Sequence, residues 1–279
     1  MKKINIFKRS FRTLIRGLII LLSKILIIPL RLIRVKLIPP YNEITNLKYK
    51  FSDQNNRIIY NEKKKDSFDK IFIDTSLNKS MLCNLGGEKY PTNKSPYHEG
   101  FRSGFTGFYN LLFVGLKNKK INFAEIGIET NNSIKMWREY FKEANIYGFE
   151  YNDEMIENAK KDNLHNTYYH KINVHEPSSI TESFKQTNCQ FDIIIDDSTH
   201  IFDDQIRVIK NCVNFLKKNG ILVVEDIYKF RKGYSESNYY NSLKDIKHLF
   251  CETAFVETIH INNYTASWKN EKILLFVKK

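Results

Sequence analysis

Two apolar runs that each end in carboxylates constrain the fold of this chain more than any other feature. The runs are Phe191–Ile195 and Ile221–Val224. The acids and the histidine that follow them are Asp196, Asp197, His200, Glu225 and Asp226. In an open α/β sheet, ligands bind beyond the carboxyl ends of the parallel strands, so we expect these side chains to converge. Crowded carboxylates repel one another unless a cation or a shared proton relieves them, and a hard divalent cation prefers such oxygen ligands. The alternative is that the acids only cap the helices that follow.

Regular alternation of apolar and amphipathic segments from residue 121 onward predicts an α/β fold. The strand-like runs are Ile121–Ile128, Asn145–Tyr151, Thr167–Val174, Phe191–Asp196, Ile221–Glu225, Ala254–Ile261 and Lys272–Val277. The helix-like segments are Ser133–Ala144, Asp153–Asp162, Ser178–Gln186, Ile201–Lys218 and about 242–250. Such alternation implies a doubly wound, mainly parallel, seven-stranded sheet that is covered on both faces. We expect Gly220 to stop the fourth helix, and the last two strands to form an antiparallel hairpin at the sheet edge.

The basic charge of the chain is concentrated at its N-terminus. The formal net charge is +13, from 44 Lys and Arg and 31 Asp and Glu. Residues 1–40 hold ten of the basic residues and no acid, which leaves 34 basic against 31 acidic residues in the remainder. A nearly neutral body argues against a nucleic-acid partner. The four cysteines are scattered, which supports neither a zinc site nor a disulfide framework.

Residues 1–40 form a separate arm that is both basic and apolar. Six of its basic residues fall on one face of a helix opposite Leu and Ile, namely Arg9, Arg12, Arg16, Lys24, Arg31 and Arg34. We therefore expect a basic, apolar helical arm that lies on the inner leaflet of a membrane and ends at Pro39-Pro40. A spanning helix, which Lys24 and Pro29 would oppose, is the second interpretation. Packing on the domain or on a second subunit of a homo-oligomer is the third.

Residues 41–120 are interpreted as an N-terminal extension and lid, ahead of the domain at residues 121–279. The segment Asn61–Lys70 is charged and expected to be solvated. The stretch Glu88–Gly107 is a candidate lid or sugar platform, because it combines Gly, Pro and small polar residues with aromatic and imidazole side chains. Apolar spacing over Phe105–Leu116 predicts a helix that leads into the sheet.

The turn after the first predicted strand has the features of a cofactor site. It reads Glu125-Ile126-Gly127, then Asn131 and Ser133, which matches a loose pattern of S-adenosylmethionine (SAM) methyltransferases with Asn131 in place of a second glycine. Asn tolerates a left-handed backbone better than most residues, so the turn can persist. An acid at the end of the second strand can accept hydrogen bonds from ribose hydroxyls. The SAM-binding candidates are therefore Glu125, Gly127, Asn131, Ser133, Glu150 and Asp196.

These motifs together resemble the metal-dependent macrolide-sugar and rhamnosyl O-methyltransferases and the cephalosporin hydroxylase-like proteins that share their pattern. The matching segments are Thr92-Asn93-Lys94-Ser95, Glu125-Ile126-Gly127, Lys135-Met136-Trp137, Ile195–His200 with Gln205, and Val224–Ile227. The family has Asp-Asp-Gly-Ser-His where this chain has Asp196-Asp197-Ser198-Thr199-His200. It has Thr-Asp-Lys where this chain has Thr92-Asn93-Lys94. The resemblance covers roughly residues 75–279. It implies a class I, Rossmann-like methyltransferase fold.

The resemblance also implies site roles and a substrate. Mg²⁺ would be bound by Asp197, Glu225 and Asp226, and His200 would be the general base beside Asp197. The acceptor would be a sugar with vicinal hydroxyls, in a surface glycan or a glycosylated metabolite. SAM is a cytosolic cofactor, so we expect a cytoplasmic protein, peripheral at the inner membrane face. There are two alternatives. The first is a non-catalytic SAM-fold protein at the membrane surface, and the second is a cephalosporin hydroxylase-like enzyme or another iron-dependent or hydrolytic enzyme.

Overall fold

The computed structural model describes residues 57–62, 66–75, 79–229, 231–260, 262 and 271–279. All of them belong to one compact unit, Leu47–Lys279. The basic arm 1–40 and the first part of the 41–120 extension lie outside the described residues, so the membrane-directed helix stays a prediction. Within the described ranges, no helix combines the length and the apolar character that a bilayer span requires.

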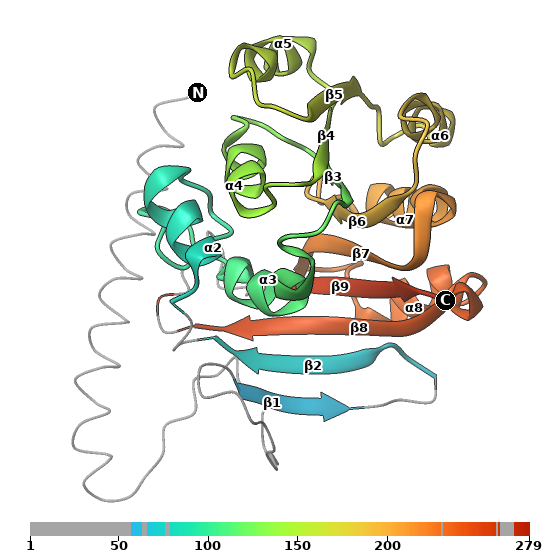
Figure 1. Cartoon of the computed structure of the whole chain (residues 1–279). Helices are drawn as coiled ribbons and strands as arrows, with labels where there is room; N and C mark the ends of the chain where they lie inside the picture. Colours follow the sequence, from blue (N-terminus) through green and yellow to red (C-terminus); the bar gives the residue numbers. More distant parts are fainter. Residues whose placement is uncertain (1–56, 63–65, 76–78, 230, 261, 263–270) are drawn as a thin grey trace, which may run out of the picture. The chain divides into compact units, whose positions relative to one another are not determined.

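A single twisted sheet of nine strands forms the centre of this unit, in the order β1-β2-β8-β9-β7-β6-β3-β4-β5 (Figure 1). All seven predicted runs form strands: β3 Asn122–Ile126, β4 Asn145–Glu150, β5 Thr167–Lys171, β6 Phe191–Asp196, β7 Leu216–Tyr228, β8 Phe250–Ile259 and β9 Glu271–Lys278. The continuous apolar run of β6 is explained by burial on both faces, because Ile193, Ile194 and Ile195 are all fully buried.

The expected number of seven strands is wrong, because two strands from the N-terminal extension enlarge the sheet. β1 (Arg57–Glu62) pairs antiparallel with β2 (Asp69–Asp74), and β2 pairs parallel with β8. The segment Asn61–Lys70, expected to be solvated, therefore contributes to both strands. Backbone pairing with the exposed side of β8 stabilises β2 even though charged residues begin and end it.

The closing hairpin is antiparallel as expected, but it is not at the edge of the sheet. β9 lies between β7 and β8, and β2 covers the other side of β8. Gly220 is also not a helix stop: it lies within β7, whereas helix α7 (Phe202–Cys212) ends earlier. A Cβ at Gly220 would lie 2.9 Å from the Lys217 carbonyl oxygen and 3.0 Å from that of Phe191. The glycine therefore permits close approach of β6 and β7 where their register shifts.

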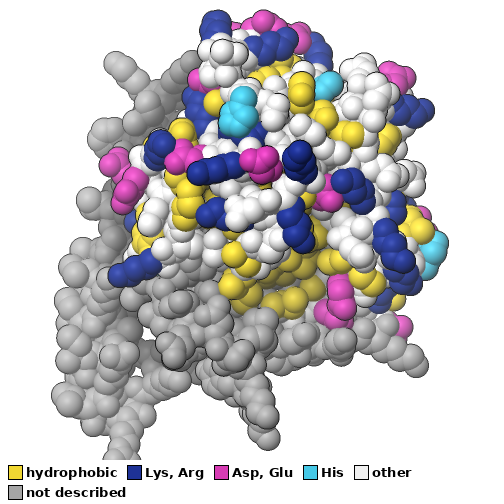
Figure 2. All heavy atoms as spheres, viewed as in Figure 1, with side chains coloured by type: hydrophobic (Ala, Val, Ile, Leu, Met, Phe, Trp, Pro, Cys, Tyr) yellow, Lys and Arg dark blue, Asp and Glu magenta, His cyan; other side chains and the backbone are white. Residues whose placement is uncertain are grey.

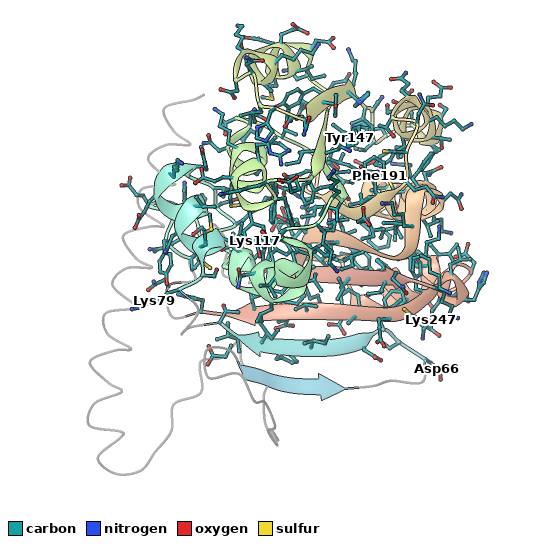
Figure 3. The ribbon with its side chains drawn as sticks, in the orientation of Figure 1. Asp66, Lys79, Lys117, Tyr147, Phe191 and Lys247 are labelled. Carbon is teal, nitrogen blue, oxygen red and sulfur yellow. The ribbon has the colours of Figure 1, made fainter. Side chains whose placement is uncertain are left out.

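Helices cover both faces of the sheet and enclose two apolar cores (Figure 1). One face is covered by α6 (Pro177–Gln186), α7 and α8 (Glu236–Leu243), and the other by α2 (Met81–Asn84), α3 (Phe105–Phe113), α4 (Asn132–Tyr140) and α5 (Asp153–Lys161). Tyr147 of β4 and Phe191 of β6 meet in the first core, with ring centroids 5.2 Å apart (Figure 3). Trp137 is fully buried in the second core. This arrangement confirms the doubly wound α/β class.

The helix expected at about 242–250 occurs earlier in the chain, as α8. Ser235 begins it by accepting a hydrogen bond from the Asn238 backbone N–H at 3.2 Å, a typical N-cap.

On the surface, Figure 2 shows basic and acidic side chains interspersed over the described part of one face.

Candidate active site

The turn between β3 and α4 adopts a backbone that few residues tolerate. Gly127 has φ +87° and Asn131 has φ +64°, so both occupy the left-handed region. The Gly127 N–H donates to the Phe149 carbonyl at 2.8 Å, which ties the turn to the end of β4. Asn131 therefore takes the conformation that was expected where the loose pattern has a second glycine.

A cavity of about 740 Å³ opens beside this turn. Several predicted site residues line it: Gly127, Ser133, Glu150, Asp197 and His200. The rest of the lining comes from the strand ends, from the turn itself and the start of α4, from α5, and from the segment between the π-helical turn Leu85–Lys89 and α3. It includes Thr92, Asn93, His98, Thr130, Asn132, Met155, Ile172 and Val174. The cavity is thus reached both by the turn expected to bind the cofactor and by the residues expected to carry the chemistry.

Glu150 braces the turn as well as lining the cavity. Its Oε2 accepts the Ile128 N–H at 3.1 Å, and its Oε1 accepts the N–H groups of Tyr151 at 2.8 Å and Asn152 at 3.0 Å. A carboxylate held by backbone donors on both oxygens is fixed in orientation. The carboxylate at the end of β4 is thus held in a fixed position where it can bind a ligand in the cavity.

Three other predicted cofactor residues lie beneath the cavity rather than in its wall. Asn131 is buried, and its side-chain amide donates to Asp162 at 2.9 Å and to the Tyr169 hydroxyl at 2.8 Å. Glu125 is fully buried, and burial raises its pKa to about 7 against the opposing effect of Lys94. Burial likewise raises the pKa of Asp196 to about 6, and its Oδ1 accepts the Ser198 hydroxyl at 2.6 Å. These three side chains support the loops that form the cavity wall.

Asp197 and His200, which follow β6, come together with Asp226, which lies in the last part of β7. One ligand atom from each lies within 4.8 Å of the others. His200 Nε2 is 3.5 Å from Asp226 Oδ2 and 3.9 Å from Asp197 Oδ1. His200 has φ +56° and Asp226 has φ +55°, so the backbone is left-handed at both positions. Two carboxylates aimed at one point suit a hard divalent cation, whereas an imidazole is a poorer Mg²⁺ ligand and is left to move a proton.

Glu225 is not brought into that group, although the resemblance implies that it is a metal ligand. Its side chain is 2% exposed, and its Oε1 accepts the Tyr109 hydroxyl at 2.6 Å. Its Oε2 accepts Lys94 Nζ at 2.7 Å. Glu225 and Asp226 are neighbours on β7 at a point where the pairing with β9 shifts register and Asp226 has a left-handed backbone.

Lys94 is a site residue to which the sequence analysis gave no role. It is 1% exposed, and Nζ donates to Asp197 Oδ2 as well as to Glu225, and lies 3.3 Å from Glu125 Oε1. Burial alone would lower the pKa of Lys94, but Asp197, Glu225 and Glu125 hold it well above its ordinary value. The segment Thr92-Asn93-Lys94 was the available signal, because it matched a family motif without an assigned role. Nothing local in the sequence pointed to the cavity residues Met155, Ile172 and Val174.

Comparison with known proteins agrees with this architecture. A family model described as "Methyltransferase domain" matches residues 129–273. The 8-demethyl-8-(2-methoxy-alpha-L-rhamnosyl)-tetracenomycin-C 3'-O-methyltransferase of Streptomyces olivaceus is 25% identical over 131 residues, which cover 44% of this chain and 32% of that protein. The chain thus spans less than two thirds of that relative.

Solved structures of the MycE methyltransferase from the mycinamycin biosynthetic pathway share the fold. The complex with Mg, SAH and mycinamycin VI matches with a TM-score of 0.53 at 18% identity, over 72% of this chain and 55% of that one. A complex with Mg and SAH matches with a TM-score of 0.52, at the same identity and coverage. With the family model covering half of the sequence and the sheet order, turn and cavity described above, the chain belongs to the methyltransferase domain family.

Proposed function

We propose that this protein is a SAM-dependent, Mg²⁺-dependent O-methyltransferase that acts on a sugar hydroxyl. The observation that carries the proposal is the single cavity whose wall joins the Gly127 turn and Glu150 to Asp197 and His200. Methyl transfer requires the methyl donor and the acceptor oxygen to be held in line and close together. One cavity lined by both sets of residues meets that requirement.

Each part of the cavity has a role in this proposal. Glu150, whose carboxylate accepts four backbone N–H groups, would accept hydrogen bonds from the ribose of the cofactor. Asp197 and Asp226 would hold Mg²⁺; the resemblance adds Glu225, whose oxygens contact Lys94 and Tyr109. When bound, SAM supplies the methyl group and Mg²⁺ supplies positive charge that favours ionisation of a hydroxyl.

His200 would accept the proton of the acceptor hydroxyl at Nε2. A sugar hydroxyl is too weak an acid to ionise unaided at pH 7, so a base at this position is needed. The adjacent Asp226 carboxylate, 3.5 Å from Nε2, would stabilise the imidazolium that forms. Loss of the proton to His200 and transfer of the methyl group, with cleavage of its bond to the sulfonium sulfur, leave a neutral ether on the sugar and S-adenosylhomocysteine. Residues Pro91, Thr92, Asn93 and His98 would cover the acceptor and keep water out.

A sugar acceptor is favoured by the relatives. The S. olivaceus relative is named as a methyltransferase of a rhamnosyl tetracenomycin, and MycE was solved with mycinamycin VI. We infer an acceptor of the same chemical class, in a glycosylated metabolite or a surface glycan. The basic, apolar arm 1–40 leads us to place the reaction at the inner face of the cytoplasmic membrane. Retention of the arm-deleted protein on anionic vesicles as strongly as the full chain would contradict this placement.

Incubation with methyl-labelled SAM and rhamnose-bearing glycosides tests the proposal. We expect label in the sugar in the presence of Mg²⁺, and loss of transfer in EDTA that is restored by excess Mg²⁺. Full transfer in EDTA would remove the metal from the mechanism. SAM binding without transfer to rhamnosides or cell-envelope glycans would favour a non-catalytic or differently reacting protein.

A further inference from the structure

One buried ammonium group connects three strand ends of the sheet. Lys94 Nζ contacts Glu125 of β3, Asp197 immediately after β6, and Glu225 of β7. Lys94 belongs to residues 90–104, here called the cover loop, which runs from the π-helical turn Leu85–Lys89 to α3. Other residues of the same loop line the cavity. A lysine this buried is rare without paired charges, and here every charge it meets belongs to the strand ends.

We propose that Lys94 is a positioning residue that keeps Glu225 in an ion pair, so that Asp197 and Asp226 hold the metal beside His200. This inference rests on the proposed function. The ligand set of this chain then differs from the one implied by the resemblance. The difference is in Glu225, which becomes an internal partner of the lysine.

The contacts of Glu225 support this division. Both of its oxygens are engaged, one by Tyr109 and one by Lys94, and its carbonyl oxygen accepts Gln205 Nε2 at 2.9 Å. To reach a cation in the cavity, Glu225 would have to leave a buried ion pair, and breaking such a pair by removing one partner is strongly destabilising. The Asp226 side chain, in contrast, is 13% exposed, and its Oδ2 lies 3.5 Å from His200 Nε2.

Lys94 also fixes the direction of Asp197. The ammonium engages Oδ2, while Oδ1 is the oxygen that lies nearest His200. One oxygen of Asp197 therefore contacts the lysine, and the other lies on the side of His200. In addition, the lysine charge offsets part of the repulsion among the clustered carboxylates, which otherwise disfavours their ionised forms.

The cover loop holds Lys94 in this position through its own backbone contacts. The Thr106 N–H donates to the Lys94 carbonyl at 3.0 Å, and the Ser103 N–H donates to the Asn93 carbonyl at 2.7 Å. The Ser95 hydroxyl donates to the Cys83 carbonyl at 2.6 Å. The lysine is therefore anchored on both sides before its side chain reaches the carboxylates.

Mn²⁺ binding to the full-length protein, without SAM or acceptor, tests the proposal through electron paramagnetic resonance of the free ion. The variants are Glu225→Gln, Asp226→Asn, Lys94→Met and the double variant Lys94→Met/Glu225→Gln. Lys89→Met is the matched control, because that lysine is 57% exposed and pairs with Glu139 away from the cluster. Circular dichroism identifies the variants that fold.

We expect Asp226→Asn to weaken Mn²⁺ binding far more than Glu225→Gln does. We expect the Glu225→Gln effect to grow by about tenfold when Lys94 is replaced, a coupling within the range for residues of one ion-pair network. Lys89→Met should leave the affinity unchanged. An equal Glu225→Gln effect in both backgrounds would overturn the proposal. Glu225→Gln as damaging as Asp226→Asn would also overturn it, even if Lys94→Met does not fold.

The failure of this inference is distinguishable from failure of the proposed function. A wild-type protein that binds no Mn²⁺ overturns the metal in the proposed function and this inference with it. A wild-type protein that binds Mn²⁺ but shows no coupling between Lys94 and Glu225 overturns this inference alone.

Discussion

Gly127 and Asp197 approach so closely that a Cβ on the glycine would lie 2.3 Å from the Asp197 carbonyl oxygen. The contact joins the cofactor turn after β3 to the carboxylate loop after β6. It is made possible by the absence of a side chain at Gly127 and by its φ of +87°. The two halves of the proposed chemistry are therefore held together by backbone packing.

Gly127→Ala should damage SAM binding and stability together. The left-handed backbone alone costs a non-glycine residue about 1–3 kcal/mol, and the clash with Asp197 adds to that. Gly115→Ala is the control, because a Cβ there meets nothing within 4 Å. Calorimetric titration with S-adenosylhomocysteine and denaturant unfolding measure both effects. Wild-type affinity in the Gly127→Ala protein would show that the turn does not form part of the cofactor site.

Glu150→Gln should weaken cofactor binding for two reasons: the charge is lost, and the hydrogen bonds that orient the side chain are disturbed. In Glu150→Gln, one amide nitrogen must face a backbone N–H that the carboxylate now accepts, at Ile128 or at Tyr151. Hydrogen bonds to a charged group contribute about 1.5–3 kcal/mol, so SAM affinity should fall by roughly tenfold or more. Glu157→Gln, on the exposed side of α5, is the matched control. Equal affinities of the two variants would exclude Glu150 from the site.

His200→Asn should reduce kcat by about 10²–10⁴-fold, the usual contribution of a general base. Asparagine is the appropriate replacement because it tolerates the φ of +56° at this position. SAM affinity should persist, because His200 faces the acceptor side of the cavity in the proposed mechanism. His248→Asn, at an exposed position, should retain full activity. Near-normal turnover by the His200 variant would contradict the role as base.

Glu125 should make stability fall as the pH rises from about 4.5 to about 7. Its ordinary pKa is 4.5, and burial raises it to about 7 in the folded protein. Within that window the unfolded state releases its proton first, so ionisation favours unfolding, by about 3 kcal/mol at most. Glu125→Gln should lack this component. Denaturant unfolding of both proteins at pH 5 and pH 7.5 measures the difference, and identical pH dependence would show that Glu125 titrates normally.

The parts of the fold set by local pattern were predictable from the sequence. β6 is found at the predicted residues, because its apolar run is buried on both sides, and α5 was predicted to within one residue, because Asn152 caps its start. β2 was not predicted, since its strand character depends on pairing with β8, some 180 residues later in the chain. The extent of β7 was missed for a similar reason, because Gly220 resembles a helix stop unless its approach to β6 is known.

The candidate site divides in the same way. The convergence of Asp197, His200 and Asp226 follows from two strand ends and the topology of a parallel sheet. The separation of Glu225 from Asp226 depends on Lys94 and Tyr109, which come from segments whose placement no local pattern fixes. Likewise Glu125, Asn131 and Asp196 occupy the motif positions, but packing turns their side chains beneath the cavity.

Anomalous X-ray scattering from crystals grown with Mn²⁺ and S-adenosylhomocysteine tests the central claim most directly. We predict one manganese peak among Asp197, Asp226 and His200, in the same cavity as the cofactor product bound near Gly127 and Glu150. A peak elsewhere, or cofactor bound with no manganese beside it, would contradict metal-assisted methyl transfer at this site.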